Sequence, residues 1–178
     1  MSFIALIRED WVTNDRDWSR PGFRALAVHR FGQWVMAIRP RLMRGIPAKV
    51  YWVLYRHVRN YYGIELPYKA RIGRRCRIAH QSGIVVHPNA RIGDDCLLRH
   101  NVTIGAARDH RAWEAPCLEN GVQVGAGAQV LGPITIGEGA RIGPNAVVMT
   151  NVPPGATAFG NPAQLTLHIH RRKKRTAH

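Results

Sequence analysis

Residues 117–148 read CLENGVQVGAGAQVLGPITIGEGARIGPNAVV, and a large aliphatic residue returns at every sixth position of this stretch. This period excludes an α-helix, because 3.6 residues per turn cannot keep every sixth residue on one face. A coil with three short flat sides can keep it, since each side uses about six residues and turns one aliphatic side chain inward. Stacked coils then bury a continuous aliphatic ladder, with glycine at the tight corners. The aliphatic positions are 118, 124, 130, 136, 142 and 148.

The same period extends toward the N-terminus in two further frames. Isoleucine, valine or leucine stands at 72, 78 and 84, and in a shifted frame at 86, 92, 98 and 104. The segment 106–116 interrupts the period, so we expect it to leave the coil as a loop. The pattern predicts a mainly β protein, a parallel β-helix of hexapeptide repeats over residues 63–165 with a loop at 106–116.

Residues 1–62 show a helical pattern instead. Apolar residues recur at steps of three and four over 21–38 and again over 48–62, with breaks at Pro40 and Gly45–Pro47 between them. We interpret this short N-terminal segment as two helices packed on a core. The alternative is that its aromatic, Arg-rich surface makes a peripheral contact with a membrane face where a lipid-linked substrate is presented. No run of 18 apolar residues occurs, so we expect no membrane span.

The charge balance points to polyanionic partners. The chain has 26 Lys and Arg against 11 Asp and Glu, a net charge of +15, and part of it lies in the basic tail 166–178. Such a surplus favours nucleic acid, an anionic membrane, an acidic polysaccharide or a phosphate-rich cofactor. We do not expect nucleic acid, because the basic residues are not interleaved with aromatic ones in a known motif. Three cysteines without a close pair favour a reduced, cytoplasmic setting.

Four segments carry a resemblance to a known family: GIELPYKARIG (63–73), AHQSGIVV (79–86), VTIG (102–105) and GAGAQVLGPITIG (125–137). They resemble the hexapeptide-repeat acyltransferases, and within them the serine O-acetyltransferases. They look closer still to short acetyltransferases found with colanic acid and other exopolysaccharide genes, which share the lead-in 55–65 and the segment 99–105. The resemblance implies a left-handed β-helix, acetyl-CoA as co-substrate and a homotrimer. The expected location is cytoplasmic, with a position at the inner membrane face as the alternative.

The resemblance assigns the catalytic base to His80 and its partner acid to Glu65, fifteen residues earlier. Histidine titrates near neutral pH and can take the proton of an alcohol that attacks a thioester. With about eighteen residues per coil, an offset of fifteen is expected to bring the two side chains near each other on adjacent turns. The carboxylate would then orient the ring and stabilise the imidazolium. The alternative is that His80 is a histidine merely exposed on a coil side.

Two more histidines belong to the predicted site with open roles. His100 follows the cofactor-side strand and is either a contact to the acceptor or thioester, or a structural histidine. His110 lies in the loop 106–116. Serine acetyltransferases carry a second active-site histidine at the position of Ala115, so this role is either absent or filled by His110.

The resemblance also implies an acetyl-CoA groove between neighbouring β-helices. Small residues there allow the pantetheine arm to approach the backbone, and a basic residue lies near the nucleotide phosphates. The same glycines are equally readable as corner residues only. No His, Asp and Glu cluster has the spacing of metal ligands, so we expect no metal. The matching cofactor positions are Gly105, Ala106, Ala126, Arg141, Gly143 and Pro144.

Departures from serine acetyltransferases bear on the acceptor. An aspartate that helps hold the serine ammonium is Ala79 here, and an arginine that binds the serine carboxylate is Glu114. A lost charged hydrogen bond weakens binding by about 1.5–3 kcal/mol. The sequence therefore favours a sugar hydroxyl of an exopolysaccharide or capsule precursor. The alternatives are serine O-acetylation in cysteine biosynthesis and, in another class, a non-catalytic β-helix binding module.

Overall fold

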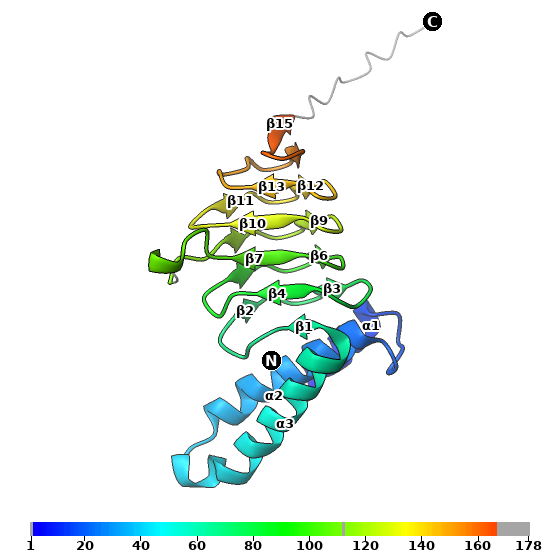
Figure 1. Ribbon diagram of the computed structural model, residues 1–178. Coiled ribbons are helices and arrows are strands. Elements are labelled where there is room, and N and C mark those ends of the chain that lie inside the picture. Colours follow the sequence, from blue (N-terminus) through cyan, green and yellow to red (C-terminus); the bar gives the residue numbers. More distant parts are fainter. Residues whose placement is uncertain (1, 112, 167–178) are drawn as a thin grey trace, which may run out of the picture.

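The computed structural model describes residues 2–111 and 113–166, so the basic run 171–175 and Ala112 lie outside the described residues. Helices come first in the chain, and a tapering stack of short parallel strands follows them (Figure 1). The helices are α1 (Phe3–Thr13), α2 (Pro21–Ala37), the 3-10 helix η1 (Arg41–Arg44) and α3 (Gly45–Tyr62).

Three parallel sheets form the sides of a prism. Sheet A consists of β1 (Ile64–Glu65), β4 (Ile84–Val86), β7 (Thr103–Gly105), β10 (Gln129–Leu131) and β13 (Val147–Val148). Sheet B consists of β2 (Arg71–Ile72), β5 (Arg91–Ile92), β8 (Cys117–Leu118) and β11 (Thr135–Ile136). Sheet C consists of β3 (Arg77–Ile78), β6 (Leu97–Leu98), β9 (Gln123–Val124), β12 (Arg141–Ile142), β14 (Thr157–Phe159) and the antiparallel β15 (Gln164–Thr166).

The aliphatic period builds the core of the prism. All thirteen aliphatic positions from 72 to 148 are buried, so each coil adds its side chains to one continuous ladder. Smaller buried residues fill the remaining interior positions; they include Ala70, Cys76, Ala90, Cys96, Val102, Ala128 and Ala146. Because burial of each aliphatic side chain contributes about 1.5–3 kcal/mol, the stack is stabilised along its whole length.

The shift of frame between positions 84 and 86 has a structural cause. Ile78 pairs with Leu98 in sheet C, while Val85 pairs with Thr103 in sheet A. From sheet C to sheet A the chain therefore advances seven residues in the lower coil, from Ile78 to Val85. In the coil above it advances five, from Leu98 to Thr103. The two additional residues lie in the segment 79–83, which holds His80.

The helices cover the open lower edge of the prism, where unpaired strand groups would otherwise remain. Arg30 on α2 is buried; its Nε pairs with Asp10 Oδ2 at 3.0 Å, and its two terminal nitrogens donate to the carbonyl oxygens of Ile72 and Gly73, each at 2.6 Å. Asn14 donates to the carbonyl of Cys76 at 3.3 Å. Side chains from α1 and α2 thus take the place of a missing coil.

The chain passes from helix to prism at one residue. Gly63 has φ +63°, and its N–H donates to the carbonyl of Arg59, which closes α3 in a left-handed cap. α3 begins at Gly45, three residues before the predicted start, and α1 forms an additional helix of its own. The loop between β7 and β8 projects from the side of the stack (Figure 1).

Candidate active site

His80 stands at the corner between sheets C and A, in the longer corner 79–83. Its side chain is exposed and its φ is +71°. Non-glycine residues rarely adopt this left-handed conformation, although histidine and asparagine do so more often than most. Such strained positions are frequent at functional sites, where the surrounding structure holds them in place. The longer corner therefore presents the imidazole to the outside of the prism.

His100 lies at the same corner, one coil above. The two rings are 5.7 Å apart between centroids and stand nearly perpendicular, at 83°. His100 Nδ1 is buried and has no hydrogen-bond partner among the described residues. A buried polar atom without a partner is uncommon and calls for an explanation, such as a ligand or water that satisfies it. The structure thus brings two of the predicted histidines together.

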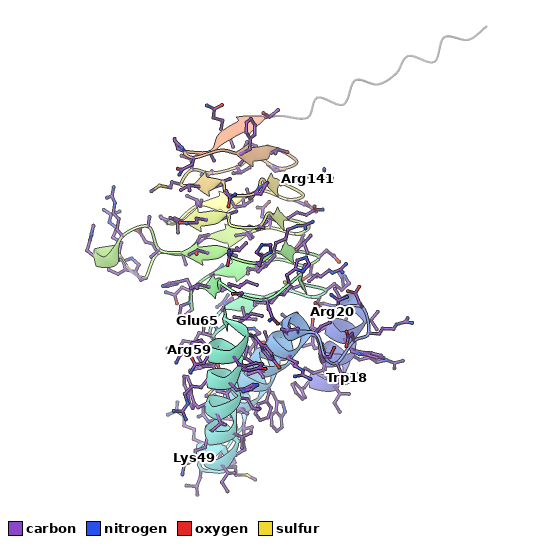
Figure 2. The ribbon with its side chains drawn as sticks, turned by 45° about the vertical axis from the view of Figure 1, so that its right-hand side comes forward. Trp18, Arg20, Lys49, Arg59, Glu65 and Arg141 are labelled. Atoms are coloured by element: carbon purple, nitrogen blue, oxygen red, sulfur yellow. The ribbon has the colours of Figure 1, made fainter. Side chains whose placement is uncertain are left out.

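A groove of about 510 Å³ opens beside these rings. One wall is the start of α2, where Gly22 lies so close to β3 that a Cβ would overlap the carbonyl oxygen of Ile78. The positive end of the α2 dipole therefore faces the groove. The lining residues are Arg20, Pro21, Gly22, Ile78, His80, Gln81 and His100. In Figure 2, Arg20 is labelled at the base of the stack, near the α1–α2 connection.

Glu65 lies on β1, in the coil below His80, but not directly beneath it. Ile64 pairs with Ile84, so the first coil takes twenty residues and Glu65 lies under Val85. No hydrogen bond joins Glu65 to His80 among the residues that the structure describes. The expectation of contact assumed a coil of about eighteen residues. The carboxylate–imidazole pair stays a prediction, and the longer coil is the correction to the spacing behind it.

Tyr55 of α3 lies close to Glu65. Burial, then the negative charge of Glu65 and a hydrogen bond to it, raise the pKa of Tyr55 to about 12. The hydroxyl of Tyr55 therefore lies close to the carboxylate of Glu65. Figure 2 shows Glu65 on the first coil, directly above the end of α3. The sequence signal was the lead-in 55–65, which contains both residues, although it did not reveal their contact.

Three of the six predicted cofactor residues line a second groove, of about 340 Å³, on sheet C. Ala126, Arg141 and Pro144 lie there together with Arg99, a residue that the sequence reasoning missed. Register places Arg99 at the level of Gly125 in the next coil, and Gly143 follows in the coil above. Two guanidinium groups beside small residues suit phosphate groups and a close backbone approach.

Gly105 and Ala106 lie elsewhere on the prism. They end β7 at the corner between sheets A and B, whereas Ala126 precedes β10 at the corner between sheets C and A. His110 belongs to the short 3-10 helix η2 (Asp109–Arg111) in the projecting loop, on the same side as Gly105. Within one chain, the predicted residues therefore occupy two different edges of sheet A, and the structure does not bring His110 to His80.

Ala115 and Glu114 lie at the end of the projecting loop. Ala115 packs partly buried against the core, and Glu114 lies 3.4 Å from Arg111 within the same loop. In the described part of the chain, no three His, Cys, Asp or Glu side chains gather as a metal site would need.

The family model described as "Bacterial transferase hexapeptide (six repeats)" matches residues 118–149. A serine acetyltransferase of Synechococcus elongatus is 37% identical over 149 residues, which are 82% of this chain and 57% of that protein. The soybean serine acetyltransferase complexed with serine superposes with a TM-score of 0.75 at 32% identity, over 92% of this chain and 68% of that one. Serine acetyltransferase of Brucella abortus in complex with coenzyme A superposes with a TM-score of 0.77 at 28% identity. The match covers 92% of this chain and 67% of that one.

These similarities confirm the predicted left-handed β-helix with its N-terminal helices. The chain spans 50% to 60% of the length of the curated relatives reported from Escherichia coli, Synechococcus and Mycobacterium tuberculosis. All of them are serine acetyltransferases, so they do not support the expected closer resemblance to exopolysaccharide acetyltransferases.

Proposed function

The chain belongs to the family of hexapeptide-repeat acyltransferases, and from this premise we propose that it transfers the acetyl group of acetyl-CoA to a hydroxyl acceptor. The observation that carries the proposal is the exposed His80 at a lengthened corner, paired with His100 and open to a groove. The coenzyme A complex of the Brucella relative supports acetyl-CoA as the donor. We include a cytoplasmic setting in the proposal, as the cysteine pattern favours.

His80 is the general base of the proposed reaction. Its imidazole takes the proton of the acceptor hydroxyl, whose oxygen forms a bond to the acetyl carbonyl carbon while the carbon–sulfur bond breaks. The imidazolium then returns the proton to the departing sulfur, so the products are an O-acetyl ester and the free thiol. Glu65, oriented by Tyr55, is the proposed source of negative charge that stabilises the imidazolium, and His100 is the proposed contact to acceptor or thioester.

The cofactor cleft is proposed to lie between two copies of the chain. Gly105 and Ala106 at one edge of sheet A and Ala126, Arg141 and Pro144 beyond the other edge cannot line one cleft within one chain. A homotrimer with threefold symmetry would set the first edge of each copy against the second edge of its neighbour and form three equivalent clefts. The same packing would bring the loop with His110 of one copy toward His80 of the next.

Replacing Arg141 with glutamine is expected to raise the KM for acetyl-CoA about tenfold while kcat changes little, because a charged hydrogen bond to phosphate is worth about 1.5–3 kcal/mol. Steady-state thiol release at varied acetyl-CoA concentration measures this. The matched control is Arg91→Gln on sheet B, which removes another exposed arginine, one that does not line the sheet C groove. An equal rise of KM in both variants would show that the groove does not bind the donor.

L-serine is the acceptor that the relatives favour. Each relative reported above is a serine acetyltransferase, and the soybean protein is described in complex with serine. On this proposal the acceptor hydroxyl is the serine side chain, and Arg20, which lines the groove beside His80, is the proposed cation for the carboxylate.

A sugar hydroxyl is the second candidate, and specific residues favour it. Ala79 and Ala115 offer no charge to a zwitterionic acceptor. Glu114, held near Arg111, would repel a carboxylate. Arg20 is itself paired with Asp15 at 3.1 Å and with Asp17 at 3.6 Å, which reduces the positive charge that the groove offers.

A thiol-release assay with acetyl-CoA and a panel of acceptors distinguishes the two candidates. The panel contains L-serine, L-serine methyl ester, serinol, nucleotide sugars and oligosaccharide repeat units. Serine acetylation predicts release with L-serine and at least about a tenfold loss with serinol, which lacks the carboxylate. Release with sugars and none with L-serine would overturn the first candidate and support the second. No release with any acceptor would favour the non-catalytic binding module.

A further inference from the structure

The hairpin of α2, η1 and α3 has an unusual charge distribution. It extends from the base of the prism, opposite the end where the chain leaves the stack (Figure 1). Between Trp18 and Ile64 the sequence contains no aspartate or glutamate at all. Over the same range it contains nine basic residues: Arg20, Arg24, Arg30, Arg39, Arg41, Arg44, Lys49, Arg56 and Arg59. Arg30 is buried and paired with Asp10, and Arg20 is paired with Asp15 and Asp17, so the other seven cations give the hairpin its positive charge.

The tip of this hairpin is apolar. Leu42 is 93% exposed, Ile46 79% and Met43 67%. These side chains lie among Arg39, Arg41 and Arg44, so large aliphatic groups and guanidinium groups alternate at one end of the molecule. Exposed aliphatic side chains that gather in one place usually mark a surface that is covered in use.

The apolar surface continues along α3. Ile46, Val50, Val53 and Tyr61 recur at steps of three, four and eight residues, so they lie on one side of the helix, and all four are exposed. The opposing stripe of Tyr51, Tyr55, Val58 and Tyr62 is buried and accounts for the packing of α3 on the rest of the protein. The exposed stripe is thus additional to what the fold needs.

Cations flank the exposed stripe. Lys49 and Arg56 lie beside it on α3 and are both exposed. Figure 2 shows Lys49 low on the hairpin and Arg59 close to the first coil, so positive charge extends over the length of the helix. An apolar stripe bordered by Lys and Arg is the arrangement of helices that lie in a membrane interface.

We propose that this hairpin docks on an anionic phospholipid surface. The docking residues are the tip, 39–46, and the exposed stripe of α3. Lipid phosphates would supply the negative charge that the hairpin lacks, and the boundary of the acyl region would accept Leu42 and Ile46. No helix in the described ranges 2–111 and 113–166 is long and apolar enough to cross a membrane, so the binding is peripheral.

A second copy of the chain is a poorer occupant for the same surface. Two hairpins placed tip to tip would bring Arg39 and Arg41 of both copies together without one carboxylate between them. Like charges in such a contact repel. In the homotrimer proposed above, three tips would point to one side and bind the surface together, which raises the affinity further. The docking itself does not depend on the acceptor or on the trimer.

Vesicle flotation of the full chain tests the proposal. Phosphatidylcholine vesicles that contain phosphatidylglycerol should carry the protein upward, while pure phosphatidylcholine vesicles should carry little of it. The variant Leu42→Ser/Ile46→Ser should lower the partition coefficient by about tenfold or more, because two buried aliphatic groups are lost. Arg39→Gln/Arg41→Gln should lower it by about tenfold and reduce its dependence on salt.

The matched control is Arg71→Gln/Arg91→Gln, which removes two exposed arginines from sheet B. It should bind vesicles as the unaltered chain does. Every variant keeps the basic run 171–175, so binding through that run would leave the tip variants unchanged and overturn the proposal. Absence of binding to anionic vesicles would also overturn it. Sedimentation velocity would then show whether the tip joins copies of the chain instead. In that case a larger assembly would form with the unaltered chain and be lost in the Leu42→Ser/Ile46→Ser variant.

Discussion

Replacing His80 with asparagine is expected to lower kcat for acetyl transfer about a hundredfold to ten-thousandfold, with the KM for acetyl-CoA nearly unchanged. Asparagine cannot take the proton of the acceptor hydroxyl. It tolerates the left-handed backbone of this corner, where φ is +71°, better than alanine does, so the corner should keep its shape. Thiol release under saturating acetyl-CoA, with the acceptor that the panel identifies, measures the effect.

The pH profile gives a second readout of the same variant. With a histidine base, kcat/KM falls on the acid side as the imidazole becomes protonated, and this limb should be absent from the residual activity of the variant. The matched control is His57→Asn, an identical change at an exposed histidine of α3. Unchanged turnover in the His80 variant, or an equal loss in the His57 variant, would remove His80 from its assigned role.

Replacing Arg30 with methionine is expected to destabilise the fold by about 3–5 kcal/mol, because removal of one partner of a buried ion pair leaves the other charge unpaired. Arg30 is 4% exposed, and Asp10 is fully buried. The change would also remove the donors to the carbonyl oxygens of Ile72 and Gly73, at the lower edge of the prism. The methionine side chain keeps similar volume, so a cavity contributes little to the loss.

Urea unfolding at fixed protein concentration measures this effect, because the stability of an oligomer depends on that concentration. The control is Arg56→Met, which removes an exposed arginine of α3 and should change stability by less than about 0.5 kcal/mol. The double variant Arg30→Met/Asp10→Leu should recover part of the loss, since it removes the unpaired carboxylate but not the unpaired carbonyls. A loss below about 1 kcal/mol in the single variant would contradict the role of Arg30 as the closing group of the prism.

The family motif assigned His80 as the catalytic base, but it did not show what surrounds that residue. The change of frame between 84 and 86 is visible in the sequence, but only the register of the sheets shows that it lengthens the corner that holds His80. Glu65 was placed by counting about eighteen residues per coil. The first coil takes twenty, because the additional residues of the corner must be accommodated before Ile84 pairs with Ile64. Only the register of the sheet shows this length, which places Glu65 under Val85.

The cofactor positions show a similar division. The small residues and Arg141 were recognisable one by one, and three of them line the groove on sheet C. Gly105 and Ala106 lie at another edge of the prism, which a linear motif cannot reveal because it carries no information on which corner each residue occupies. Arg99 was missed because no sequence motif marks it. The next two coils carry Gly125 and Gly143 at the same position, so the repeat does not predict an arginine there.

The sequence by itself determined the prism. Each six-residue repeat carries its own aliphatic residue for the interior, so the pattern can be recognised without knowing which coils pack together. Tertiary structure alone decided how the prism is closed at its base and what faces the corner that holds His80. Arg30 reaches carbonyls 42 and 43 residues further along the chain, and the start of α2 meets β3 at Gly22. Such contacts join segments without a shared period, so their partners are defined only when the helices pack beneath the first coil.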